Sequence, residues 1–400
     1  MVALMPVQYF LILDSGATII RYVGWVVFAA WIAQKLLYKE PLNSVVAGPL
    51  VKPILAFLYL CLISALWSFS TTWNVAFFSY LQLVLWVFMI IDLIDSQPRL
   101  ERLLFSLLIG ILASAYILLQ EFLTRQAGWE FGTVAEGGFG DRNTTAASFL
   151  YGIPFLFYWI LEGSLWRKTL GIASVGLLLV GVGISASRTN LLILPLLLVL
   201  LARSMPNLSH KAHYVLIACL LLTISMYFWP WAQIEYRFSD IWAGGTPEDL
   251  GGRIKTFDRA FEQFFRSPLL GRGLGSYRAR YNIPAHNLFL EMAMQLGVFG
   301  LLAMVWIWVV AWRRLAAAHQ RAQASNTSDL FLLIRAVRLS LTVYLLYSLS
   351  MSSQSERLLW FTFALSGVCY NLAHKKTLSP TSNISTWNRN SSKKKPYSPT

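Results

Sequence analysis

Three arginines in this sequence have the chemistry to hold a diphosphate. Arg188 lies in a short connection between two apolar runs, Arg237 just beyond a later run, and Arg253 in the long polar connection that follows. A planar guanidinium forms paired hydrogen bonds to phosphate oxygens and keeps its charge at any accessible pH. An arginine at a membrane edge is costly unless it meets water or an anion. The structural alternative for Arg188 is a side chain that reaches out to lipid phosphates.

His286 has the chemistry of a general base. It lies in the stretch NIPAHNLFLEMAMQLGVFG, directly ahead of an apolar run. A helix beginning near Asn287 directs its partial positive charge at His286, which favours a bound anion and a neutral imidazole. Glu291, one turn into that helix, could orient the site or balance an arginine. The alternatives are a histidine that caps the helix and a glutamate that contacts another helix.

The composition places these residues in a membrane protein. Of 400 residues, 56% are hydrophobic and 13% charged, and the mean hydropathy is +0.55, which excludes a soluble globule. Apolar runs of about 18 residues recur, each long enough to cross a bilayer core. Because lipid offers the backbone no hydrogen-bond partners, we expect an all-α fold. The net charge of +14 falls in short clusters between the runs, so no nucleic acid is expected.

The apolar runs predict twelve transmembrane helices and a topology. The expected spans are about 1–13, 17–37, 50–67, 74–91, 103–120, 144–161, 169–185, 189–202, 214–231, 287–312, 331–351 and 358–373. Alternate connections carry the basic clusters Lys35/Lys39, Arg99/Arg102, Arg167/Lys168, Arg203/Lys211, Arg313/Arg314/Arg321 and Lys375/Lys376. By the positive-inside rule these connections and both termini are cytoplasmic. The long connections 121–143 and 232–286, and with them the three arginines and His286, then face outward, where a lipid-linked diphosphate presents its head group.

Two polar segments interrupt or follow the membrane domain, which we expect over residues 1–376. In the connection 232–286, apolar residues at helical spacing predict an amphipathic helix over about 253–266, on the membrane surface or against the bundle, ended by Ser267-Pro268. Flanking glycines predict flexible joints at Gly251-Gly252 and at Gly271, Gly273 and Gly275. Residues 377–400 are rich in Ser, Thr, Asn and Lys and predict a disordered cytoplasmic tail.

Other catalytic chemistries lack their residues. Cys61, Cys219 and Cys369 lie inside apolar runs and suggest neither a disulfide framework nor a metal site. No P-loop, HExxH or GxSxG motif occurs in the required context, and the outer connections contain no DxD-type acidic pair. We therefore expect no metal and no cofactor, and the arginines would have to stabilise a departing diphosphate.

At these residues the chain resembles the bacterial O-antigen ligase family (WaaL-type), which is related to O-antigen polymerases and pilin O-oligosaccharyltransferases. The matching motifs are SASRTNLLILPLLL, IEYRFSDI, LGGRIKTFDRAFEQFFRSPLLGRGLGSY and AHNLFLEMAMQLGVFG. They occur in the family's order, and twelve spans with one long late loop match its architecture. The resemblance implies a GT-C-like glycosyltransferase in the inner membrane of a Gram-negative bacterium, with its active site facing the periplasm.

The resemblance also implies a reaction and roles for residues. The donor would be an O-antigen polysaccharide on undecaprenyl pyrophosphate, the acceptor a sugar hydroxyl of lipid A-core, and the transfer metal-independent and inverting. By position, His286 matches the family's essential histidine, Arg188 and Arg253 its essential arginines, and Arg237 a supporting one, with Asn287, Glu291 and Arg272 as further supporting residues. Polymerases share much of this pattern, and pilin-type enzymes rank behind them. A transporter or flippase for an anionic lipid would use the same arginines, but should show discontinuous helices or pseudo-symmetric halves.

Overall fold

The computed structural model describes residues 1–12, 18–38, 48–125, 136–204, 221–222, 226, 229, 231, 235, 248–282, 284–325 and 328–378. Within these ranges the protein is helical, with a single isolated bridge between Ile12 and Thr18, which confirms the expected all-α class. The elements are η1 (Val2–Leu11), α1 (Ile19–Tyr38), α3 (Val51–Ile63), η2 (Ser64–Leu66), α4 (Trp73–Leu93), α5 (Gln97–Arg125), η3 (Gly137–Phe139), α6 (Arg142–Glu162), α7 (Leu165–Ile184), α8 (Arg188–Arg203), α11 (Glu248–Arg266), α12 (Ser276–Tyr281), α13 (Leu288–Ala324), α14 (Ser328–Ser348) and α15 (Arg357–Leu378).

Seven of the described helices are long and apolar enough to cross a membrane. They are α1, α4, α5, α6, α7, α13 and α14. The span expected at 1–13 is not a membrane-length helix: η1 is a 10-residue 3-10 helix that contains Pro6, and at about 2.0 Å rise per residue it is shorter than the bilayer core. The span expected at 214–231 falls mostly outside the residues described. The expected total of twelve spans therefore stays a prediction.

The bundle is held together around α13 and α6. α13 packs against α15, α14 and α3, while α6 packs against α7 and α14, and η1 lies against α5 and η3. Aromatic side chains such as Trp360, Tyr151 and Tyr344 are fully buried between these helices. One charged contact lies within the bundle, where Asp92 accepts a hydrogen bond from Trp31 Nε1 at 2.8 Å and pairs with Lys35 at 2.8 Å. Pairing reduces the cost of charge within a membrane span.

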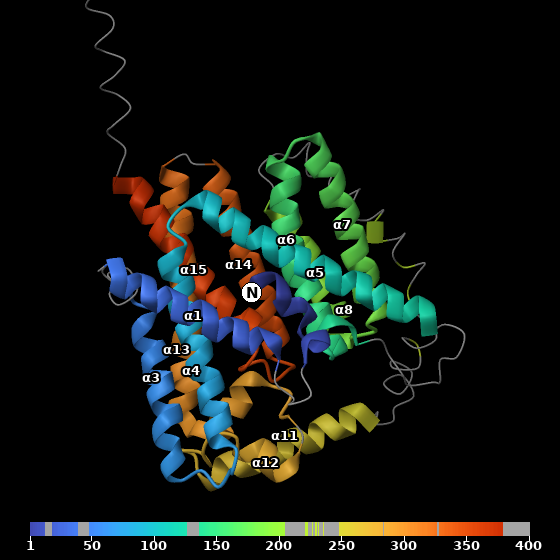
Figure 1. Cartoon of the computed structure of the whole chain (residues 1–400). Coiled ribbons are helices and arrows are strands. Elements are labelled where there is room, and N and C mark those ends of the chain that lie inside the picture. Colours follow the sequence, from blue (N-terminus) through green and yellow to red (C-terminus); the bar gives the residue numbers. More distant parts are fainter. Residues whose placement is uncertain are drawn as a thin grey trace, which may run out of the picture.

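The two ends of the bundle differ in composition. Figure 1 shows α11 and α12 side by side at one end, and the turn between α6 and α7 at the opposite end. The α11–α12 end contains the polar connection that precedes α13. The opposite end contains the basic residues Arg167 and Lys168 at the start of α7. The expected division into an outer face and a cytoplasmic face stays a prediction.

Candidate active site

His286 lies at the mouth of α13, as expected from the sequence. Its backbone has φ +55°, a left-handed conformation that costs a non-glycine residue about 1–2 kcal/mol. The next residue, Asn287, is the N-cap of α13: its Oδ1 accepts a hydrogen bond from the Leu290 N–H at 2.9 Å. The Asn287 Nδ2 donates to the Leu349 carbonyl at 2.8 Å, just beyond the end of α14. The Asn287 side chain therefore anchors the loop that carries His286 both to the first turn of α13 and to the end of α14.

Glu291 supports this loop from inside the bundle. Its side chain is buried, and its Oε2 accepts a hydrogen bond from the Ala285 N–H at 3.4 Å while Oε1 accepts one from Gln295 Nε2 at 3.0 Å. The side chains of Ser352 and Gln354, from the connection between α14 and α15, lie beside the carboxylate. Glu291 thus contacts the backbone next to His286 and also the connection between α14 and α15. Both expected roles, orienting the site and contacting another part of the bundle, are compatible with these contacts.

α13 is broken at Gly297, where the sequence predicts one span over 287–312. Gly297 has φ +66° and ψ −163°, so residues 288–296 form a separate helical piece. The break leaves backbone groups of α13 without partners in the helix, and these groups bond to the segment after α11. The Val298 N–H donates to the Pro268 carbonyl at 2.8 Å, and the Gln295 carbonyl accepts from the Gly273 N–H at 2.8 Å. A Cβ at Gly297 would lie 2.1 Å from the Leu269 carbonyl oxygen. Only glycine fits this crossing.

The GRGLGSY segment is tightly packed, which corrects the expectation of a flexible joint there. The Leu274 carbonyl accepts a hydrogen bond from Ser68 Oγ at 2.9 Å, and the Gly275 N–H donates to Gln295 Oε1 at 2.9 Å. A Cβ at Gly273 would lie 2.3 Å from the Ser68 Cα. The glycines therefore provide close approach between two helix connections. The other expected joint, Gly251-Gly252, lies inside α11, so that expectation is also wrong.

Arg272, in the same segment, lies beside a small pocket between α11 and α12. Tyr277 and Gln263 also line it. The Arg272 Nε is buried and has no hydrogen-bond partner in the described part of the chain. Gln263 Nε2 donates instead to the Tyr281 hydroxyl at 2.9 Å. Arg272 therefore remains a candidate supporting residue with donor capacity to spare.

Arg188 is the first residue of α8 and is fixed against the N-terminus of α6. Its neighbour Ser187 donates a hydrogen bond to Asn143 Oδ1 at 2.8 Å, and Asn190 Nδ2 donates to the Asn143 carbonyl at 2.9 Å. Ala186, ahead of them, has φ +47°. The side chain of Arg188 is half-buried. The N-terminal ends of α6 and α8 are thus joined through Ser187 and Asn190, which lie on either side of Arg188 in the chain.

A chain of contacts leads from the α6–α8 junction toward His286. Asp141, the N-cap of α6, accepts hydrogen bonds from Thr144 N at 2.7 Å and Thr144 Oγ1 at 2.6 Å. The Tyr347 hydroxyl lies 2.8 Å from Thr144 Oγ1 and donates to Glu356 Oε1 at 3.2 Å. Glu356 closes the connection 349–356, whose other end holds Asn287. The junction beside Arg188 and the His286 loop therefore share one end of the bundle, linked through α14.

Glu356 has an unusual protonation environment within this chain of contacts. Burial is the main cause that raises its pKa to about 7, and the charge of Asp141 adds to the rise. Hydrogen bonds from Tyr344, Tyr347 and Thr144 oppose it without restoring the ordinary value. This carboxyl therefore titrates near neutral pH.

The other two arginines are placed less fully. Arg237 lies outside the described residues, and of Arg253 the structure describes the backbone alone, in the first half of α11. α11 confirms the predicted amphipathic helix, begins earlier, at Glu248, and ends at Arg266 as expected. It packs against the bundle through a cluster of Ala260, Tyr277, Ala285 and Met294. Because Ala285 adjoins His286, α11 lies against the histidine loop.

The comparison with protein families gives a match over the centre of the chain. Residues 173–305 match the O-antigen ligase family model, Wzy_C. This confirms the resemblance expected from the motifs. The O-antigen ligase stretch contains the sequence-predicted site residues, which are Arg188, Arg237, Arg253, Arg272, His286, Asn287 and Glu291. No curated protein matches the chain.

Two carboxylates at this end of the bundle were missed by sequence reasoning and lie outside the O-antigen ligase stretch. Asp141 and Glu356 are separated from the matched residues and from each other in the chain. The position of Asp141 before an apolar run is a usable signal, since aspartate is a preferred N-cap. Glu356 gives no such signal, because the two tyrosines that contact it, Tyr344 and Tyr347, lie 12 and 9 residues earlier in the chain, in α14.

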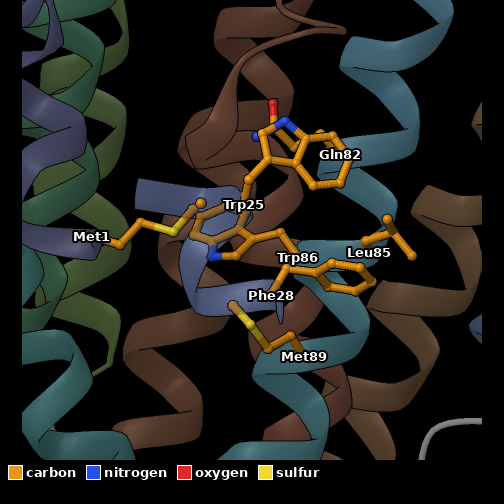
Figure 2. Close-up of a pocket in the computed structure, with 8 residues that line it drawn as sticks. Met1, Trp25, Phe28, Gln82, Leu85, Trp86 and Met89 are labelled. Carbon is orange, nitrogen blue, oxygen red and sulfur yellow. The ribbon is translucent and has the colours of Figure 1, made fainter. Parts of the chain in front are cut away.

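A small cavity elsewhere in the protein has a different character. It lies between α1 and α4, and Figure 2 shows its lining of aromatic, leucine and methionine side chains together with Gln82. The Gln82 Nε2 donates to the Arg21 carbonyl at 3.1 Å, so this amide is engaged. No acidic or basic side chain lines this cavity, and none of its residues belongs to the candidate active site.

Proposed function

We propose that the protein is an O-antigen ligase, which transfers O-antigen polysaccharide from undecaprenyl pyrophosphate to a sugar hydroxyl of lipid A-core at the periplasmic face. The family match over residues 173–305 supports the reaction class. The observation that carries the proposal is the arrangement of two helix N-termini. Arg188 begins α8 and His286 precedes α13, and contacts through Asn143, Thr144 and Tyr347 join their surroundings at one end of the bundle.

In this mechanism His286 accepts the proton of the acceptor hydroxyl as its oxygen attacks the anomeric carbon. The N-terminus of α13 favours the neutral imidazole that a base requires. Asn287 and Glu291 hold the backbone on both sides of the histidine, so the ring is positioned before substrate arrives. Positioned general-base catalysis contributes about 10²–10⁴-fold to a rate.

The arginines hold the pyrophosphate and stabilise the charge that develops as it leaves. Arg188 and Arg253 have this role in the proposal, with Arg237 as a third. The bond between the anomeric carbon and the pyrophosphate oxygen breaks as the bond to the acceptor oxygen forms, so a single displacement inverts the anomeric centre. Fixed cationic donors at a departing oxyanion supply the electrostatic contribution that is usually the largest in such reactions. The energy comes from the sugar–pyrophosphate bond, so neither nucleotide nor metal is required.

The surface of α11 supports delivery of a lipid-linked donor. Phe261 and Phe265 are exposed on this helix, and Leu269 and Leu270 are exposed just after it. Amphipathic helices with an exposed apolar stripe lie in the interfacial layer of a bilayer. In that position α11 would keep Arg253 at the depth of the donor's head group, while its opposite side stays packed on the histidine loop.

A transporter is the second candidate function, because the break of α13 at Gly297 is the discontinuous helix expected of that class. Here, however, the backbone of residues 268–273 occupies the break, and its hydrogen bonds use the freed groups. A general base at the helix mouth also has no role in moving an unchanged lipid. We therefore favour group transfer.

Reconstitution with a defined donor and acceptor, with chelator and without nucleotide, tests this proposal. A ligase forms donor–acceptor product, a polymerase extends the donor alone, and a transporter moves the donor across proteoliposomes without covalent change. Arg188→Ala should lower ligation at least about 100-fold, and Arg188→Lys should recover little of it because lysine lacks the paired donors. Arg203→Lys, at the other end of α8, is the matched control. Full activity of Arg188→Lys would contradict the paired contact.

A further inference from the structure

A groove opens at the end of the bundle opposite α11 and α12, where the beginning of α5 meets the α6–α7 turn (Figure 1). Its cavity volume is about 410 Å³, within the usual range for small-ligand sites. Its lining combines apolar side chains with two arginines and one glutamate, among them Glu101, Arg102, Phe105, Trp159, Trp166 and Arg167. The candidate active site uses none of them.

The apolar side of the groove faces outward from the bundle. Phe105 and Trp159 pack with ring centroids 5.0 Å apart. Trp166 is 64% exposed and Leu170 54%, although both belong to a membrane-length helix. Tryptophan at the end of a membrane helix is typical of the layer where lipid head groups meet acyl chains. The groove is therefore accessible from the lipid at head-group depth.

The polar side of the groove consists of two arginines, Arg102 and Arg167, and one carboxylate, Glu101. Arg102 Nε donates to the Pro98 carbonyl at 3.3 Å, and the Arg167 guanidinium lies 5.8 Å from the centre of the Trp166 ring. Neither forms an ion pair within the described ranges of the chain. The Glu101 carboxylate shares this lining, and its Oε1 accepts hydrogen bonds from Tyr158 and Gln97, each at 2.9 Å. Most of the donors of the two guanidinium groups remain for a ligand.

We propose that this groove binds one anionic phospholipid, with its phosphate between Arg102 and Arg167 and its acyl chains along Phe105, Trp159 and Leu170. A zwitterionic lipid would bring a cation to a lining in which two arginines outnumber the single carboxylate of Glu101, and a soluble anion would leave the exposed rings without a partner. Charge complementarity and the apolar wall therefore select the same ligand. The basic clusters Arg99/Arg102 and Arg167/Lys168 place the groove in the cytoplasmic leaflet by the positive-inside rule. A lipid here would brace the α6–α7 turn against α5.

Native mass spectrometry of the delipidated full-length protein tests the proposal, with titrations of phosphatidylglycerol, phosphatidylcholine and glycerol phosphate. Phosphatidylglycerol should bind at least about tenfold more tightly than phosphatidylcholine, and glycerol phosphate should not compete. The double variant Arg102→Ala/Arg167→Ala should weaken phosphatidylglycerol binding about tenfold or more.

The matched control is Arg99→Ala/Lys168→Ala, which removes the same charge from the same end of the bundle but outside the lining of the groove. Arg99 pairs with Asp95 at 2.9 Å instead. The control should bind phosphatidylglycerol like the wild type. Equal losses in the two double variants would mean general surface attraction and would overturn the proposal. Equal binding of the two lipids, or displacement by glycerol phosphate, would overturn it as well.

Discussion

At the scale of single residues, the candidate site separates its charges by location. Two carboxylates occupy the N-termini of α6 and α15, as Asp141 and Glu356. The N-termini of α8 and α13 carry Arg188 and His286 instead. A helix N-terminus attracts negative charge. Asp141 meets this attraction at α6, and Glu291 lies in the first turn of α13, whereas the first turn of α8 contains no acidic residue and can act on a substrate anion.

Glu356 gives a prediction about pH. Its pKa is raised to about 7 in the folded protein, so the folded state binds a proton that the unfolded state has released between about pH 4.5 and 7. The stability from this group is complete below pH 4.5 and is lost as pH rises through 7. The unfolding free energy of the wild type should fall by about 1–3 kcal/mol as pH rises across this range. In Glu356→Gln the slope of the unfolding free energy against pH should be smaller. Thermal unfolding in detergent at several pH values measures it.

The control for this pH effect is Asp95→Asn, since Asp95 is half-exposed and pairs with Arg99 at the other end of the bundle. Its slope should match that of the wild type. An unchanged slope in Glu356→Gln would show that the carboxyl titrates in its ordinary range.

At the scale of elements, the decisive feature is the break in α13. It allows residues 268–273 to cross the helix, and this crossing holds the segment between α11 and the histidine loop. Gly297→Ala would place a Cβ 2.1 Å from the Leu269 carbonyl oxygen in a left-handed backbone. We expect a loss of at least about 1–2 kcal/mol of stability together with loss of ligation.

Gly176→Ala is the matched control for the α13 variant. Gly176 lies inside the membrane helix α7, where an added Cβ would meet nothing closer than Leu221 Cδ2 at 3.4 Å. Alanine should be neutral or slightly stabilising there. Comparison of thermal unfolding for the two variants measures the effect. Equal stability of the two would contradict the account of the break.

The same elements show what the sequence can and cannot predict. The apolar period of α11 and the Ser267-Pro268 stop are local signals, so the helix and its end were predictable. The break at Gly297 was not, because a glycine within an apolar run fits a continuous span and its conformation depends on Leu269 and Pro268. The glycines of GRGLGSY were misinterpreted for the same reason: flexibility and close packing use the same residue type. η1 is apolar enough for a span but too short, and its packing against α5 is a tertiary property.

At the scale of the whole molecule, the candidate active site and the arginine-lined groove lie at opposite ends of the bundle. One end contains α11 and α12 (Figure 1). His286 lies beside α11 through Ala285, and contacts through Asn143, Thr144 and Tyr347 connect its surroundings with those of Arg188. The other end carries the arginine-lined groove between α5, α6 and α7. In the orientation that we propose, a donor whose head group lies in the outer leaflet would meet the proposed transfer site, while the groove would meet the opposite leaflet. The basic clusters predict this polarity from the sequence, whereas the link between Arg188 and His286 through α14 depends on residues that the motifs do not include.

The ligation rate of His286→Ala tests the central claim most directly. His319→Ala is the matched control, because His319 belongs to the same helix but stacks on Phe331 far along α13, with ring centroids 4.3 Å apart. Both variants should insert and unfold like the wild type. With defined donor and acceptor in a purified system, His286→Ala should lose about 10²–10⁴-fold in turnover, and His319→Ala should retain it. Near-wild-type turnover of His286→Ala would contradict the assignment of the base.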